Sequence, residues 1–235
     1  MHPYPEAVDL ADFVEWTGWV LRTNGFHAST SLPLVSVCRD ELMAPFVAAV
    51  TARWGHCFDM SSLGGLPHLG RTGIAAALGH APGEGGRHRL VVFAFPHIGA
   101  AAAGDLGTVR RPGVPGTTTA CGAVEVARTA LAEGVSGVVL DPHDVEESLL
   151  VGALRSVVGD APPPGLVELT ELVRQAAVEE LSHLLSGLAS SAVPVDFALI
   201  SGVLVHGAED DRVSVVSAQV RGDGETRDLL RRSAR

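Results

Sequence analysis

Two short apolar runs constrain the fold of this chain more than any other feature of its sequence. The first, "LPLVSV" at residues 32–37, is rich in branched residues and too short for a core helix. The second, "RLVVFAF" at residues 89–95, is the clearest strand pattern in the chain. Apolar runs of this length are typical of strands that are buried on both faces of a parallel sheet.

Helical patterns alternate with these runs. Apolar residues recur at helical spacing between Val8 and Leu21, and another helix is expected to begin near Cys121. Further helices are predicted over residues 40–55, 72–81, 144–159 and 165–188. A third strand is predicted over residues 137–142, and a terminal hairpin over residues 197–207 and 212–220. The alternation predicts an α/β fold, with a mostly parallel central sheet flanked by helices and a C-terminal hairpin.

The size and charge of the chain limit its organisation and its partners. With 235 residues, 46% of them hydrophobic, the chain is expected to form a single domain over residues 1–235. Its formal charge of -10 argues against a nucleic-acid partner. No segment approaches the roughly 20 apolar residues of a membrane span, and the acidic N-terminus does not resemble a signal peptide. We therefore expect a cytoplasmic protein that has no membrane partner.

The three cysteines are too few for a disulfide framework, so their positions decide what they do. Cys38 follows the first apolar run, and His97 follows the second in the same way. Ligands of α/β sheets bind at the carboxyl ends of the strands, where both residues are expected. Together with Cys121 they offer two thiolates and one imidazole, a set that suits zinc with a fourth position for water. Asp40 is close enough in sequence to occupy or guard that fourth position.

Other interpretations of these residues remain open. Cys38 is also a small hydrophobe at the end of a buried strand, and free cysteine is among the most buried residue types. A third interpretation makes Cys38 a thiolate nucleophile with His97 as its base. The pair His56 and Cys57 in "WGHCFD" has no matching partner pair, so we expect Cys57 to belong to the core instead.

Four motifs in order carry a resemblance to a known family. The segments are "SVCRDE", "LGGLPHLGRTGIAAALGHAP", "FAFPHIG" and "TACGA". They resemble the low-CO2-inducible protein B family first known from algal chloroplasts, whose members form the theta group of carbonic anhydrases. The resemblance runs from about Phe13 to the C-terminal hairpin. It implies a fold similar to the beta-class carbonic anhydrases, a dimer or larger assembly, and zinc held by Cys38, His97 and Cys121.

The same resemblance implies an aspartate and arginine pair beside the metal. Asp40 matches the aspartate, but the beta class places its arginine two residues later, where this chain has Leu42. Arg39 is therefore the first candidate for the arginine, and Arg71 is the second. The spacing of the last two ligands also departs from the beta class, which keeps them nearly adjacent, because His97 and Cys121 are 121 − 97 = 24 positions apart.

The function expected from this resemblance is zinc-dependent, reversible hydration of carbon dioxide to bicarbonate, by attack of zinc-bound hydroxide. Leu63, Leu66 and Ile98 could line a small apolar pocket for the substrate, and His68 or His56 could carry the proton away. The alternative is a catalytically silent relative that keeps zinc and serves as a bicarbonate or carbon dioxide sensor or an assembly partner. A homodimer is expected in either case.

Overall fold

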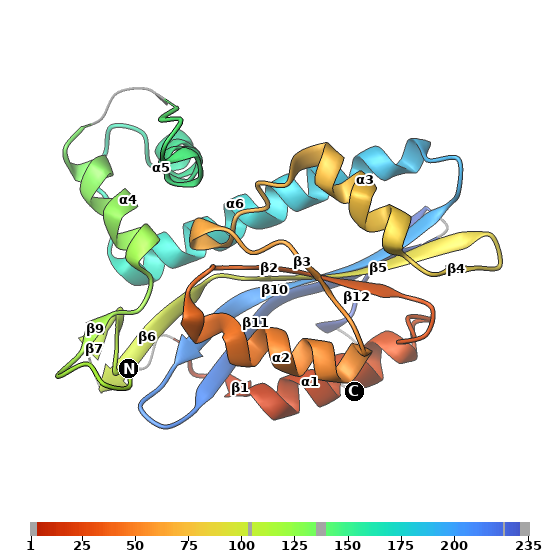
Figure 1. The fold of residues 1–235 in the computed structure, drawn as a ribbon, viewed down its shortest axis with the longest axis horizontal. Coiled ribbons are helices and arrows are strands. Elements are labelled where there is room, and N and C mark those ends of the chain that lie inside the picture. Colours follow the sequence, from red (N-terminus) through yellow and green to blue (C-terminus); the bar gives the residue numbers. More distant parts are fainter. Residues whose placement is uncertain (1–3, 103–104, 135–139, 223, 231–235) are drawn as a thin grey trace.

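The computed structural model describes residues 4–102, 105–134, 140–222 and 224–230, and its centre is a twisted mixed sheet (Figure 1). The strands follow the order β1-β11-β10-β5-β2-β3. They are β1 (Val8–Asp9), β2 (Leu32–Val37), β3 (Phe58–Asp59), β5 (Arg87–Phe95), β10 (Val195–His206) and β11 (Asp211–Gly222). The pairs β2·β3, β2·β5 and β5·β10 are parallel, and β10·β11 is the antiparallel hairpin. The predicted α/β fold with a mostly parallel centre and a C-terminal hairpin is confirmed.

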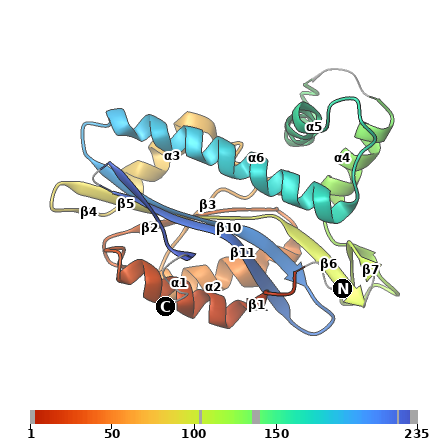
Figure 2. The same cartoon turned by 180° about the vertical axis from the view of Figure 1, so that it is seen from behind.

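Helices cover both faces of this sheet (Figures 1 and 2). One face carries α1 (Leu10–Arg22) and α2 (Ala44–Trp54), and the other carries α3 (Gly70–His80) and α6 (Leu166–Ser186). Two further helices, α4 (Gly122–Ala132) and α5 (Val145–Val158), lie beyond one end of the sheet. The remaining elements are short: η1 (Glu41–Met43), η2 (Leu63–Gly65), η3 (Gly187–Ser190), β4 (Gly83–Glu84), β6 (His97–Ala102), β7 (Asp105–Leu106), β8 (Thr108–Val109), β9 (Thr118–Thr119) and β12 (Glu225–Asp228).

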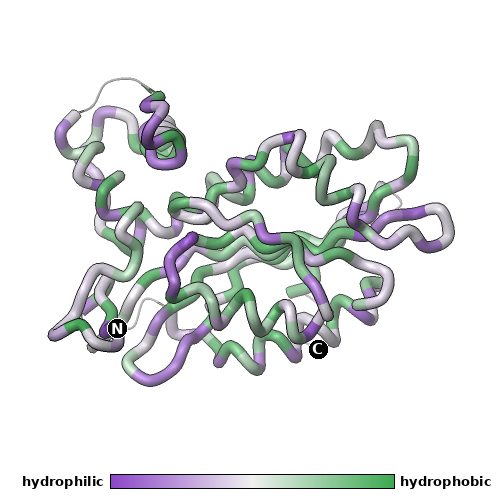
Figure 3. The backbone as a smooth tube through the Cα atoms, in the orientation of Figure 1, coloured by the Kyte–Doolittle hydropathy of each residue, from purple (hydrophilic) through white to green (hydrophobic). Residues whose placement is uncertain are grey.

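The position of β5 explains why its sequence is apolar from Leu90 to Phe95. Successive side chains of a strand point to opposite faces. Val91, Phe93 and Phe95 enter the core beneath α1 and α2, whereas Leu90 and Val92 enter the core on the opposite face. All of these side chains are buried, and the tube of the central strands is largely green, the colour of hydrophobic residues, in Figure 3. A strand segment with two buried faces therefore favours apolar residues at every position.

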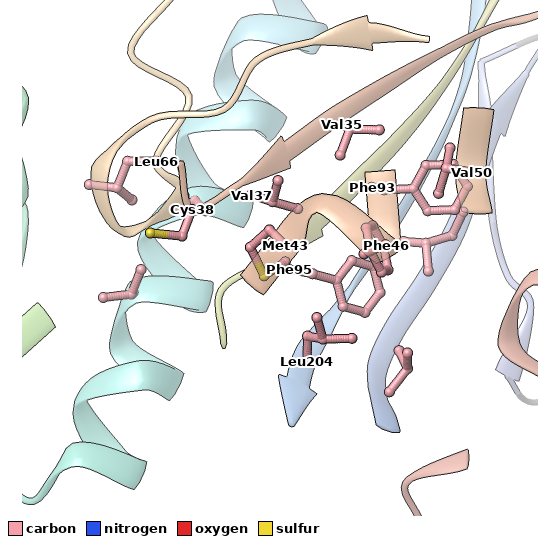
Figure 4. Packing of buried hydrophobic residues seen from close by; sticks show 14 of the residues in the cluster. Val35, Val37, Cys38, Met43, Phe46, Val50, Leu66, Phe93, Phe95 and Leu204 are labelled. Carbon is pink, nitrogen blue, oxygen red and sulfur yellow. The ribbon is translucent and has the colours of Figure 1, made fainter. Parts of the chain in front are cut away.

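Four phenylalanines form the centre of the core between the sheet and the helices α1 and α2. The ring of Phe13 lies 5.8 Å from that of Phe46 and 5.3 Å from that of Phe95, measured between centroids. Phe46 and Phe95 are 5.1 Å apart, and Phe93 contacts Phe13 edge-on. Figure 4 shows Phe46, Phe93 and Phe95 of this group, with Cys38 at the margin of the core next to Leu66. The aromatic core therefore ends where the strand β2 gives way to Cys38.

The segments between the central strands and helices differ in detail from the prediction. Residues 137–139 of the third predicted strand, 137–142, lie outside the described residues, and the described residues 140–142 are not in a strand. The helix predicted from residue 40 opens as η1, whose N-cap is Asp40: its carboxylate accepts a hydrogen bond from the Leu42 backbone N–H. The strand β6 was not predicted, because its sequence HIGAAA consists mainly of small residues and lacks a clear strand pattern. Among the described residues, no helix is long and apolar enough to span a bilayer.

Candidate metal centre

Cys38 and His97 meet at the carboxyl edge of the sheet. The strands β2 and β5 are parallel neighbours, with Val37 paired to Phe95 as their last residues. Cys38 follows β2 directly, and Pro96 separates β5 from His97, the first residue of β6. Parallel register therefore brings two residues that are far apart in sequence to the same place.

Cys121 reaches the same point through a loop that packs tightly on β6. The Gly107 N–H donates to the Gly99 carbonyl at 2.8 Å, and the Ala120 N–H donates to the Gly107 carbonyl at 2.8 Å. A Cβ added to Gly99 would lie 2.0 Å from the Thr108 carbonyl oxygen, so this approach requires glycine. Cys121 then stands at the N-cap of α4.

The three side chains form a buried cluster whose size suits a zinc ion. The Sγ atoms of Cys38 and Cys121 are 3.8 Å apart, and one ligand atom from each of these residues and His97 lies within 4.8 Å of the others. Tetrahedral zinc with Zn–S bonds of about 2.3 Å separates two sulfurs by about 3.8 Å. The buried Nε2 of His97 has no hydrogen-bond partner among the described residues. A buried ring nitrogen without a partner is explained if it serves as a ligand.

The short distance between the thiols of Cys38 and Cys121 also shifts their pKa values in opposite directions. The pKa of Cys38 is held well below its usual range, chiefly because Cys121 donates a hydrogen bond to its sulfur, with His97 adding to the effect. The pKa of Cys121 is raised because that same hydrogen bond uses its proton and because its thiol is buried. Cys38 is therefore the thiol that ionises first, and a thiolate is the form that binds metal.

Asp40 is held beside this cluster by Arg111. The Nη2 of Arg111 donates to Asp40 Oδ2 at 2.9 Å and to Oδ1 at 3.2 Å. The same guanidinium donates to the Ala120 carbonyl at 3.1 Å and to Glu41 at 2.6 Å. Because Ala120 precedes Cys121, Arg111 ties the loop that carries one thiol to the carboxylate that follows the other.

The expected pairing of Asp40 with Arg39 or Arg71 is therefore corrected. Arg39 instead contacts Glu146 at 2.7 Å and the Ser61 carbonyl at 3.0 Å, and its side chain is 60% exposed. Arg39 therefore binds partners in the segment before η2 and on α5, whereas Asp40 binds Arg111. Arg71 is exposed in the first turn of α3. The sequence analysis missed Arg111, which lies between β8 and β9 in the segment that leads to Cys121.

A small cavity of about 10 Å³ adjoins the cluster, enough for about one water molecule. Its lining is mainly apolar and comprises His97, Ile98, Gly107, Thr119, Ala120, Cys121, Val124, Leu166 and Thr170. Ile98 was expected in such a pocket, whereas Leu63 and Leu66 are outside this lining. The space next to the cluster is thus narrow and largely apolar.

The remaining histidine and cysteine candidates lie elsewhere. His68 lines a separate groove of about 590 Å³ with His183, and burial lowers its pKa. Cys57 packs against the core as expected, with its sulfur 3.1 Å from the Thr51 hydroxyl. His56 is partly buried in the turn after α2. The structure therefore brings together Cys38, His97, Cys121 and Asp40, but gives neither His56 nor His68 a contact with them.

Comparisons with known proteins place this chain among relatives with the same fold. The structure of PtLCIB4, a homolog of the limiting CO2-inducible protein LCIB, is 24% identical over 96% of this chain and 95% of that one, with a TM-score of 0.83. The structure of LCIB itself is 25% identical over 96% of this chain and 94% of that one, with a TM-score of 0.77. No curated protein matches the chain.

A match to a family model shows which protein family the chain belongs to. The model described as limiting CO2-inducible proteins B/C, beta carbonic anhydrases, matches residues 7–221. This span includes Cys38, Asp40, His97 and Cys121 and runs through the terminal hairpin. The chain therefore belongs to the limiting CO2-inducible protein B/C family, as the four sequence motifs indicated.

Proposed function

We propose that this protein is a zinc-dependent carbonic anhydrase that hydrates carbon dioxide reversibly to bicarbonate. The observation that carries the proposal is the buried convergence of Cys38, His97 and Cys121 beside the Asp40 and Arg111 pair. The family is described as beta carbonic anhydrases, which supports the same reaction. Cys38, His97 and Cys121 would hold the ion, and when bound, zinc lowers the pKa of a coordinated water to about 7.

Asp40 is suited to orient the attacking water. An ionised carboxylate only accepts hydrogen bonds, so it fixes the direction of a water proton and leaves the oxygen lone pair toward the substrate. Arg111 and the Leu42 N–H hold this carboxylate in one orientation. Without Arg111 the carboxylate would be free to turn toward the cluster and close the fourth position. Arg111 thus acts as the positioning residue that keeps Asp40 available.

The neighbouring cavity favours a small apolar substrate. Ile98, Val124 and Leu166 supply apolar walls, and the cavity is too small for an organic ligand. Carbon dioxide is a small molecule without net charge, so its contact with these apolar walls leaves no buried charge unpaired. Bicarbonate is charged and is expected to leave toward the polar side, where Asp40 and Arg111 lie.

The first experiment is stopped-flow carbon dioxide hydration on purified protein of known zinc content. The wild type is expected to carry about one zinc per chain and to hydrate carbon dioxide. Cys38→Ala is expected to lose both, whereas Cys57→Ala should keep both because Cys57 lies outside the cluster. Zinc without hydration under reducing and oxidising conditions would favour a silent sensor or assembly partner. Absence of zinc, with inactivation by iodoacetamide, would favour Cys38 as a nucleophile.

Three further expectations stay predictions of this proposal. A homodimer is expected, and sedimentation of the zinc-loaded protein would test it. Localisation of the tagged chain would test the expected cytoplasmic site. Limited proteolysis would test whether residues 1–235 form one domain, because a single domain is expected to resist cleavage between its elements.

A further inference from the structure

The second ring nitrogen of His97 is engaged by another buried histidine. His97 Nδ1 and His206 Nε2 are 3.0 Å apart, and the two residues are 1% and 3% exposed. The rings meet edge to face, with centroids 5.1 Å apart. A hydrogen bond between two buried imidazoles fixes the orientation of both rings, because neither has water as an alternative partner.

The sheet register produces this contact. Strand β6 runs parallel to β10, with His97 opposite Leu204 and Gly99 opposite His206. His97 and Gly99 are two residues apart, so their positions share one face of the sheet. His206 lies on that same face as the diagonal neighbour of His97, within reach of a long side chain. The contact is therefore built into the strand pairing.

A carboxylate completes the arrangement on the other side of His206. Asp211 begins β11 and is the direct cross-strand partner of His206 in the hairpin. Its Oδ1 lies 2.8 Å from His206 Nδ1, and the Asp211 side chain is 23% exposed. The three residues form a chain of hydrogen bonds from the edge of the hairpin to the metal cluster.

Only one placement of protons on the ring nitrogens of His97 and His206 satisfies both hydrogen bonds and leaves His97 able to bind metal. The Asp211 carboxylate only accepts, so His206 Nδ1 donates to it. In a neutral imidazole the other nitrogen then accepts, so His206 Nε2 receives the proton of His97 Nδ1. His97 Nε2 is left with its lone pair, and this is the buried atom without a partner. Asp211 therefore sets the direction of donation in both hydrogen bonds, from His97 to His206 and from His206 to Asp211.

We propose that His206 and Asp211 are positioning residues that fix the tautomer and the ring direction of His97 so that Nε2 presents its lone pair to a metal. The inference deepens the proposed function and rests on its metal centre. Partners of this kind raise the basicity of a histidine ligand and typically change metal affinity by about 10- to 100-fold. Neither residue touches the substrate, so their effect is expected in zinc affinity before any step of the reaction.

The test compares two neighbouring aspartates. Zinc dissociation constants would be measured by competition with a chelator for the wild type, Asp211→Asn and Asp210→Asn. Asp210 is exposed in the hairpin loop and provides the matched control. Asp211→Asn is expected to weaken zinc binding about 10- to 100-fold, and Asp210→Asn to change it less than twofold. Equal affinity of the two variants would overturn the proposal.

Two further measurements separate positioning from a general loss of structure. Asp211→Glu is expected to restore part of the zinc affinity, because it keeps a carboxylate acceptor. Nitrogen-15 NMR of the metal-free wild type is expected to find the His97 proton on Nδ1, and a proton on Nε2 would refute the assignment even if the variants fail to fold. Both readouts are independent of turnover. A protein with this tautomer and tight zinc binding but no hydration would refute the proposed function alone.

Discussion

The Arg111 guanidinium donates to both carboxylate oxygens of Asp40, at 3.2 and 2.9 Å, across a sequence separation of 71 residues. This contact joins the residue next to β2 to the loop that carries Cys121. It therefore couples the position of the proposed water-orienting group to that of a proposed ligand. Arg111 is thus the arginine beside Asp40, in place of the two arginines expected from the sequence.

Replacing Arg111 should separate catalysis from metal binding. Arg111→Gln is expected to lower kcat/KM about 100-fold, because a misdirected Asp40 no longer orients the attacking water. Zinc content should stay at the wild-type level, since Arg111 lies outside the ligand cluster. Stopped-flow hydration with zinc analysis measures both quantities. Arg110→Gln is the control because Arg110 is its exposed neighbour, and an equal loss in that variant would count against the assigned role.

The close packing of Gly99 predicts a strong effect of a single methyl group. A Cβ at this position would lie 2.0 Å from the Thr108 carbonyl and 3.0 Å from the Ala120 Cβ. Gly99→Ala should push the loop before Cys121 outward, lowering stability by about 1–3 kcal/mol and weakening zinc binding. Urea denaturation and chelator competition measure these effects. Gly79→Ala, where a Cβ meets nothing within 4 Å, should be neutral or slightly stabilising.

The aromatic core predicts where stability can be lost most readily. Phe46 is fully buried and its ring contacts those of Phe13 and Phe95. Phe46→Ala is expected to lower the free energy of unfolding by about 3–5 kcal/mol, through lost burial and the cavity that remains. Denaturant titration provides the measurement. Trp19 is 56% exposed, so a loss of similar size in Trp19→Ala would show that burial does not control these values.

The sequence predicted the central elements well because their signals are local. Runs 32–37 and 89–95 are almost entirely apolar, with Ser36 and Arg89 as their only polar residues, which favours strands with two buried faces, and both strands begin and end close to the predicted bounds. That feature also located Cys38 and His97, each of which follows such a run. Cys121 was predicted at a helix start, and it stands at the N-cap of α4.

The missed features depend on contacts between distant segments. Arg111 reaches Asp40 because the loop that carries it folds back over β6, and no local pattern encodes that path. Arg39 was favoured by adjacency, but its guanidinium pairs with Glu146 on α5, a residue 107 positions away in sequence. The link from His97 to His206 depends on parallel register between β6 and β10, which pattern analysis of single segments does not provide.

A buried carboxyl on α5 predicts an unusual dependence of stability on pH. Glu147 is 8% exposed and its Oε1 has no hydrogen-bond partner within the described residues. Burial, with repulsion from Asp144 and Cys38, raises the pKa of Glu147 from 4.5 to about 7. Between these values the folded state holds a proton that the unfolded state has lost. The contribution of Glu147 to stability therefore falls as pH rises from about 4.5 to 7, and above that range the folded state carries a buried charge.

Removing this charge should stabilise the protein only at higher pH. Glu147→Gln is expected to raise the free energy of unfolding at pH 8 by up to about 3 kcal/mol, at roughly 1.4 kcal/mol per unit of pKa change. Near pH 4.5 the variant and the wild type should agree closely, because Glu147 is then largely protonated in the folded state. Urea denaturation at both pH values, with equal zinc content, measures the difference. Glu168→Gln, at an exposed position in the first turn of α6, should show no such dependence, and a constant offset for Glu147→Gln would contradict the raised pKa.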